Sequence, residues 1–348
     1  MEAALRTSAR ERAPIRIGIS SCLLGHAVRW DGGHKRDAFL VERLGRFVEW
    51  VPVCPELELG MGVPREPIRL VAQGSGATRL VSVSGGVDWT ARMRAFAQRR
   101  VRALARLGLC GYVLKARSPS CGLERVPVWR ARGGRPARRG RGMFAQALAS
   151  AWPELPIVEE GQLADSVVRD HWLERVFALH RLRALGAGRE RLAELAAFHA
   201  AHELQLLAHD PALLRRLDRL VAAASGPRAR AVRGRAADAG ARDATARRAR
   251  ATIAARYRTG FLAALRRPAT LAGEARALRR ALARLDPLLD AGERRALAAL
   301  AERAACDAGA LRAARARVRR LAGRRGASDL AGQTWLAPDP RERTLRGR

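Results

Sequence analysis

The chain has 348 residues, of which 48% are hydrophobic, and its formal net charge at pH 7 is +33. That length accommodates two domains of ordinary size, and the hydrophobic content is enough for packed cores. The sequence has no run of 18 or more apolar residues and no apolar stretch near its charged N-terminus, so it predicts neither a membrane span nor a secretory signal. Its five cysteines, an odd number, argue against a disulfide scaffold and favour the reducing cytoplasm.

The positive charge comes almost entirely from arginine. Lys35 and Lys115 are the two lysines among 66 basic residues, which leaves 66 − 2 = 64 arginines. Such an excess attracts polyanions. Interleaved aromatic residues and a recognised nucleic-acid-binding motif are missing, however. A solvated arginine surface is therefore the favoured interpretation, and contact with RNA or DNA stays open.

The first half of the chain predicts alternating strands and helices. Apolar runs that end at turn residues predict strands at 15–20, 47–54, 79–83, 110–115 and 156–160. Helical periodicity predicts helices at 88–107 and 143–151, and a Gly/Arg/Pro loop is expected at 130–141. We therefore expect an α/β domain over 15–168, with an open, mostly parallel sheet and helices, preceded by a disordered segment at 1–14.

Strand signals vanish from His171 onward. The remaining sequence is rich in Ala, Leu and Arg and predicts an all-α domain over 171–345. Within it, the segment 225–250 is of low complexity and has few large apolar residues, so we expect a mobile insertion or a loose helix there.

Three cysteines each follow a predicted strand. Cys22 lies in Ser-Cys-Leu-Leu-Gly, Cys54 in Val-Cys-Pro-Glu, and Cys121 in Ser-Pro-Ser-Cys-Gly. In open α/β sheets the ligand crevice lies outside the carboxyl ends of the strands, so one shared site is expected. None of the three belongs to a CxxC pair, as a zinc ribbon would require. Three thiolates are what an iron–sulfur cluster needs if one iron is to stay open to substrate as a Lewis acid.

Simpler interpretations of these residues stay open. Buried free thiols and a structural zinc site are the alternatives for the three cysteines. Cys110 and Cys306 are predicted to be packing residues. Asp31 and Lys115 flank the motifs and could bind substrate, although Asp31-Gly32 is also an ordinary turn.

Three histidines form a further candidate cluster. The spacing of His199, His202 and His209 places them on one face of a predicted helix. A metal or phosphate site is conceivable there, but packing or capping by these histidines is the favoured interpretation.

Taken together, the three cysteine motifs resemble the thiouracil desulfidase family over about residues 15–165. The resemblance implies a [4Fe-4S] cluster held by Cys22, Cys54 and Cys121, with Glu56 and Ser118 as catalytic residues. Later segments, among them 198–211 and 333–338, resemble a second, uncharacterised helical domain that commonly follows the first. The chain departs from the first family at Trp30, where tyrosine is expected.

The resemblance implies a cytoplasmic enzyme that removes sulfur from a thiolated pyrimidine without net redox change. The open iron would abstract the sulfur, and water would replace it. The substrate would be a small thiolated nucleobase such as 2-thiouracil, a nucleoside, or a thiouridine in RNA. The alternative is a nucleic-acid-associated accessory or binding protein with a structural cluster, which would contact RNA or DNA through its arginine-rich helical domain.

Overall fold

Strand β1 (Ile15–Ser20) lies inside a four-stranded sheet in which all neighbouring strands run parallel. The order across the sheet is β2–β1–β5–β8, with β2 at Val48–Val53, β5 at Gly111–Leu114 and β8 at Ile157–Glu159. This is the open parallel sheet that the sequence predicts, and each strand lies within one residue of its predicted bounds.

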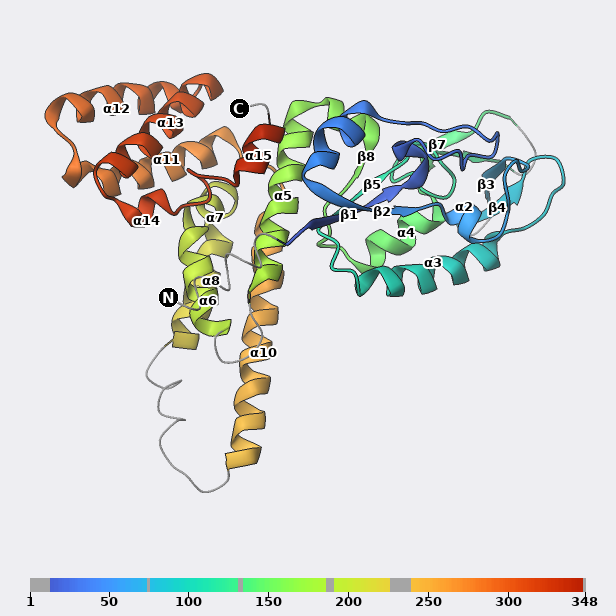
Figure 1. Ribbon diagram of the computed structural model, residues 1–348, viewed down its shortest axis with the longest axis horizontal. Coiled ribbons are helices and arrows are strands. Elements are labelled where there is room, and N and C mark those ends of the chain that lie inside the picture. Colours follow the sequence, from blue (N-terminus) through green and yellow to red (C-terminus); the bar gives the residue numbers. More distant parts are fainter. Residues whose placement is uncertain (1–12, 74–75, 131–133, 186–190, 226–238, 347–348) are drawn as a thin grey trace. The chain divides into compact units, whose positions relative to one another are not determined.

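The computed structural model describes residues 13–73, 76–130, 134–185, 191–225 and 239–346 (Figure 1). These residues form two compact units. The first unit comprises Arg12–His180 together with Thr344–Arg348, and the helical unit comprises Arg181–Arg343. Nearly all of the N-terminal segment that is predicted to be disordered, 1–14, lies outside the described residues.

Helices cover both faces of the parallel sheet. On one face, a Cβ at Gly111 would lie 2.8 Å from Val176 of helix α5, so that helix packs directly on β5. On the other face, the Tyr112 ring covers Gly18, where a Cβ would lie 2.2 Å from two ring carbons, and it lies 6.0 Å from the Phe144 ring of helix α4. Alternate strand residues thus face different helical layers. The helices and helical turns of this unit are η1 (Ser21–Leu24), η2 (Phe39–Arg43), η3 (Leu44–Arg46), α2 (Pro55–Glu58), α3 (Thr90–Ala105), α4 (Met143–Ala151), η4 (Glu160–Ala164) and α5 (Ser166–Ala184).

The first unit also contains a second four-stranded sheet, which is mixed, and the sequence predicts only one of its strands. Its order is β4–β3–β6–β7, with β3 (Ile68–Ala72), β4 (Thr78–Ser82), β6 (Val126–Trp129) and β7 (Ala137–Gly140). The prediction of a loop at 130–141 is therefore wrong for 137–140, which form β7. Strand β7 reads Ala-Arg-Arg-Gly and is almost wholly exposed, so it has no apolar alternation and is defined by its backbone pairing with β6.

The second half of the described chain is helical, as predicted. Its helices are α6 (Arg191–Ala201), α7 (Glu203–His209), α8 (Pro211–Ser225), α10 (Ala239–Ala264), α11 (Leu271–Leu285), η5 (Asp286–Leu288), α12 (Ala291–Ala304), α13 (Ala308–Arg324), α14 (Ser328–Ala331) and α15 (Pro340–Leu345). Several helices begin at side-chain caps, such as Thr270, which accepts a hydrogen bond from the Gly273 amide. Of the low-complexity segment, 226–238 lie outside the described residues, and 239–250 form the first part of α10.

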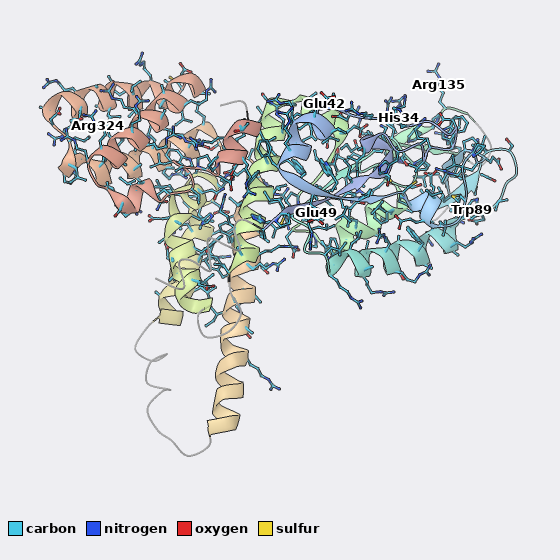
Figure 2. All side chains as sticks on the ribbon, in the orientation of Figure 1. His34, Glu42, Glu49, Trp89, Arg135 and Arg324 are labelled. Atoms are coloured by element: carbon cyan, nitrogen blue, oxygen red, sulfur yellow. The ribbon has the colours of Figure 1, made fainter. Side chains whose placement is uncertain are left out.

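None of the helices in the described ranges has the length and apolar character that crossing a membrane requires. Many arginine side chains are exposed, as at Arg135 in the first unit and Arg324 on α13 (Figure 2).

Candidate functional site

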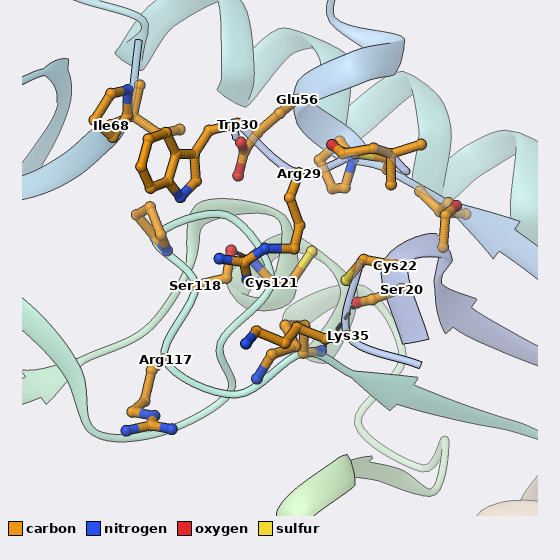
Figure 3. A pocket seen from close by; sticks show the side chains of 18 of the residues that line it. Ser20, Cys22, Arg29, Trp30, Lys35, Glu56, Ile68, Arg117, Ser118 and Cys121 are labelled. Atoms are coloured by element: carbon orange, nitrogen blue, oxygen red, sulfur yellow. Dashed lines mark hydrogen bonds between the residues drawn. The ribbon is translucent and has the colours of Figure 1, made fainter. Parts of the chain in front are cut away.

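A cavity of about 390 Å³ in the first unit is lined by all five residues that the sequence singles out for a site. Figure 3 shows Cys22, Cys121, Ser118 and Glu56 around the same space. Cys54, the third cysteine, also lines it. Residues that are as much as 99 positions apart in the sequence therefore converge on one place.

Parallel strands explain this convergence. Cys22 lies in the 3-10 turn η1 directly after β1, and Cys54 is the N-cap residue of α2 directly after β2. Cys121 follows β5, which pairs with β1 on the side opposite to β2. Because the carboxyl ends of parallel strands meet at one edge of a sheet, the three loops meet there too.

The turn that carries Cys121 is fixed to the N-terminus of helix α4. The amide of Met143 donates to the carbonyl of Pro119 at 3.1 Å, and the amide of Phe144 donates to the carbonyl of Ser120 at 3.0 Å. The first amides of a helix have no partner within the helix, so these carbonyls satisfy groups that would otherwise be unpaired. The turn is thereby held in place by secondary structure.

The thiols of Cys22 and Cys121 are buried, that of Cys54 is partly buried, and the three affect one another electrostatically. Burial raises the pKa of Cys22 to about 11, and a Cys54 thiolate would raise it further, whereas Lys115 and Arg29 act in the opposite direction. Burial also raises the pKa of Cys54, and it raises that of Cys121 well above its ordinary value. Without a bound positive centre, the three side chains therefore favour the neutral thiol.

The donor set fits an iron–sulfur cluster. Three cysteine sulfurs share a cavity, and each thiol would release its proton on binding a metal, as cysteine ligands do. Among the residues that the structure describes, no three His, Cys, Asp or Glu side chains are grouped so that they could hold one metal ion. In a four-iron cluster each thiolate binds a different iron atom, so its ligands need not converge on a single ion.

Glu56 is held by two neighbours at the edge of the cavity. One of its oxygens, Oε1, accepts a hydrogen bond from Ser120 Oγ at 2.6 Å. The other, Oε2, accepts from Arg65 Nε at 2.9 Å and from Arg65 Nη2 at 2.5 Å. The Arg65 and Glu56 side chains are only 5% and 13% exposed, so this is a buried charge pair. The carboxylate consequently has one defined orientation.

Ser120 and Ser118 have different surroundings, although both belong to the same motif. Ser120 is fully buried and donates to Glu56. Ser118 lines the cavity, and its Oγ accepts from the amides of Ser120 at 3.2 Å and Cys121 at 3.1 Å. The sequence gives no reason to prefer Ser120, because its contact with Glu56 joins two segments 64 positions apart.

Positive side chains surround the cavity, and they include both lysines of the chain, Lys35 and Lys115. Lys115 Nζ donates to the carbonyl of Ala116 at 3.1 Å and pairs with Glu160. Arg29 and Arg117 also line the cavity (Figure 3). These charges attract negative groups, and at Cys22 those of Lys115 and Arg29 counteract part of the effect of burial.

Other candidates from the sequence lie outside this cavity. Asp31 accepts hydrogen bonds from Arg29 and from the Gly33 amide, which is the arrangement of an ordinary turn. Cys110 belongs to the apolar core, as predicted. Cys306 is exposed and follows the end of α12, so its prediction as a packing residue is wrong.

The three histidines do not share a helical face, so that prediction is wrong. Helix α6 ends at Ala201, and His202 is the N-cap residue of α7. His199 lies between Tyr257 OH at 3.0 Å and Asp218 Oδ1 at 2.8 Å. His202 is buried and stacks on Phe198, with ring centroids 3.9 Å apart, so the packing interpretation is confirmed for it.

Comparison with known proteins concerns the first unit. Residues 17–160 match the family described as 2-thiouracil desulfurase. The "Uncharacterized protein YbbK" of Bacillus subtilis (strain 168) is 31% identical over 114 residues, which are 30% of this chain and 72% of that protein. A solved structure, the [4Fe-4S]-dependent thiouracil desulfidase TudS, is 29% identical with a TM-score of 0.36, and the similarity covers 43% of this chain and 93% of TudS. The family match includes none of the helical unit, whose resemblance to a second family stays a prediction.

Proposed function

Since the chain belongs to the 2-thiouracil desulfurase family, we propose that its first unit removes sulfur from a thiolated pyrimidine in the cavity lined by Cys22, Cys54 and Cys121. The observation that carries this proposal is the convergence of three cysteines from three separate loops on one cavity that also contains Glu56 and Ser118. Free buried thiols would give no reason for this convergence.

The three cysteines are proposed to hold a [4Fe-4S] cluster. When bound by only three thiolates, such a cluster supplies one open iron, a thiophilic Lewis acid. Lys115 and Arg29 lower the pKa of Cys22, so they favour the thiolate that the cluster requires. The remaining positive side chains offset the negative charge of a thiolate-bound cluster.

Glu56 is proposed to handle the protons of the water that replaces sulfur. Glu56 lines the cavity and its Oε1 accepts from Ser120, so a proton taken up by that oxygen would be shared with a fixed neighbour. Oε2 accepts two hydrogen bonds from the charged Arg65 and Oε1 accepts one from a neutral hydroxyl, so Oε1 is the oxygen proposed to act. Ser118, whose oxygen already accepts two amides, would donate its hydroxyl hydrogen to water or to the pyrimidine.

The overall reaction balances without an electron donor or acceptor. The C=S bond of the pyrimidine is replaced by C=O, and the oxygen comes from one water. The two protons of that water leave with the sulfur as H₂S, or as HS⁻ and H⁺. No atom is oxidised or reduced, so the chemistry that a bound cluster would supply is that of a Lewis acid and no electron transfer is required.

Anaerobic reconstitution with iron and sulfide tests the proposal. We expect about four irons per chain, a charge-transfer absorption from thiolate to iron, and conversion of 2-thiouracil to uracil with release of sulfide. Cys22→Ala, Cys54→Ala and Cys121→Ala should each lose the bound iron. Cys110→Ala is the matched control, because this cysteine is equally buried but does not line the cavity, and it should keep iron and activity.

Glu56→Gln separates a catalytic site from a structural cluster. It should keep its iron and lose sulfide release. A chain that binds no iron after reconstitution would contradict the proposal. Iron without turnover of 2-thiouracil, a thiolated nucleoside or thiouridine-containing RNA would favour the accessory alternative, in which the cluster is structural. Affinity for RNA that falls steeply with salt and is unchanged in Glu56→Gln would then identify the binding protein.

A further inference from the structure

Trp30 is a half-exposed indole at the cavity that the three cysteines line. The residue is 44% exposed, and it is the one aromatic residue among the exposed large hydrophobic residues of the described ranges. It also lines the cavity, where Figure 3 shows it beside Ile68. Tryptophan is among the side chains whose burial is most favourable, so a ligand that covers this exposed indole would gain free energy from burying it.

The backbone of Trp30 is fixed to the network around Glu56. Its carbonyl accepts from the amide of Arg65 at 2.9 Å, and the Arg65 guanidinium binds Glu56. The turn around it is closed by the Gly32 amide, which donates to the carbonyl of Arg29 at 3.0 Å. The backbone that carries the indole is therefore joined to the same network that holds the carboxylate, and the indole itself lines the cavity.

Three other tryptophans of the chain have a positive side chain over the ring. Arginine Cζ atoms lie 4.5 Å from the ring centroid of Trp89, 5.5 Å from that of Trp129 and 4.3 Å from that of Trp335. Within the part of the chain that the structure describes, no ring or guanidinium contact of this kind is found for Trp30. Its ring is therefore available to a flat ligand in the cavity.

We infer that Trp30 is the stacking platform for the pyrimidine ring, an inference that rests on the proposed function. A planar base stacks on an aromatic side chain whatever its ring substituents, because every base has a π face. Because Trp30 and Glu56 line the same cavity, stacking on the indole would place the pyrimidine, with its thiocarbonyl, in the space that the carboxylate also borders. Loss of the indole should weaken binding roughly tenfold, which corresponds to about 1.4 kcal/mol.

Binding of the product tests this inference without turnover. Full-length protein is reconstituted anaerobically, and the affinities for uracil and uridine are measured by calorimetry and by quenching of tryptophan fluorescence. Trp30→Ala should bind roughly tenfold more weakly. Trp30→Phe should keep most of the affinity but lose the part of the quenching that comes from the indole. Trp89→Ala is the control, since Trp89 is an aromatic residue of the same unit that does not line the cavity.

Kinetics give a second readout. Trp30→Ala should raise KM for 2-thiouracil much more than it changes kcat, because stacking holds substrate and transition state alike. Iron content should equal that of the wild type. Wild-type affinity in Trp30→Ala, with the wild type active, would overturn the inference and leave the proposed function intact. Equal losses in Trp30→Phe and Trp30→Ala would also overturn it, since the ring face would not be what matters. An iron-loaded wild type that neither binds pyrimidine nor releases sulfide would overturn both.

Discussion

Arg65→Met leaves a buried carboxylate without its charged partner, and we expect it to destabilise the first unit by about 3–5 kcal/mol. The estimate follows from the side-chain exposures of 5% for Arg65 and 13% for Glu56, which place the pair in the range where removal of one partner costs most. Arg65 also donates to the carbonyls of Gly62 at 2.9 Å and Val28 at 3.1 Å, and methionine satisfies neither. Methionine has a similar length and no branch, so little volume is lost.

Two further variants show whether the buried charge is the cause. Arg65→Met combined with Glu56→Gln removes both charges and keeps an acceptor for Ser120, so it should be more stable than the sum of the single losses predicts by about 1–2 kcal/mol. Arg36→Met is the matched surface control. Its pair with Glu42 at 3.0 Å has side chains that are 41% and 57% exposed, and its loss should cost less than about 1 kcal/mol.

Urea unfolding of the iron-free chain, followed by tryptophan fluorescence, measures these differences. All tryptophans except Trp335 lie in the first unit, so the signal reports mainly on that unit. A loss in Arg65→Met no larger than that of the surface control would refute the reasoning. So would a double variant that is less stable than the two single losses together predict.

Two predictions concern packing and pH. Gly18→Ala would place a methyl group 2.2 Å from the Tyr112 ring and should cost about 1–3 kcal/mol in urea unfolding, whereas Gly161→Ala, with no atom within 4 Å of the new Cβ, should be close to neutral; equal effects would contradict the packing argument. In the helical unit, the pKa of His202 lies well below its usual range, mainly because the ring is buried and secondly because Arg181 is close. The hydrogen bonds of the ring fit the neutral form, since Nδ1 donates to the carbonyl of Phe198 and Nε2 accepts from Arg181. The unfolded chain takes up a proton at His202 below about pH 6.5 and the folded chain does not, so stability should fall as the pH falls from 6.5 toward 5, by at most about 1.4 kcal/mol per pH unit from this group. Circular dichroism of His202→Gln, which keeps a donor and an acceptor but does not titrate, should show a shallower decline; an unchanged slope would rule His202 out as the cause.

The parallel sheet could be predicted because its central strands, β1 and β5, are almost wholly buried. In strand β1 three isoleucines alternate with other residues and the strand ends at a turn, a pattern that is distinctive in sequence. The second sheet lacks this signal. Strand β6 contains a proline at a register shift, and β7 is exposed and rich in arginine, so their pairing depends on backbone hydrogen bonds that side-chain patterns do not report.

The convergence of the cysteines could be predicted for the same reason as the sheet, since each of them follows a predicted parallel strand. The hydrogen-bond partners of Glu56 could not be predicted. Its partners Arg65 and Ser120 are 9 and 64 positions away, and neither spacing corresponds to a local motif. Arginine is also so abundant in this chain that no single one stands out from composition. Contacts between loops are determined by tertiary structure, and the sequence pattern alone does not reveal them.

The two lysines stand out in the composition of the chain, and both of them belong to the site. In a chain with 64 arginines, whatever favours arginine over lysine acts at every basic position, and Lys35 and Lys115 are the two exceptions. Both line the cysteine cavity. A guanidinium is larger and planar, whereas an ammonium is a compact charge with three donors. At Lys115 the ammonium reaches both the Ala116 carbonyl and Glu160 from a side chain only 15% exposed. Both exceptions to the arginine excess therefore belong to the proposed active site, where Lys115 presents a compact cation to Glu160.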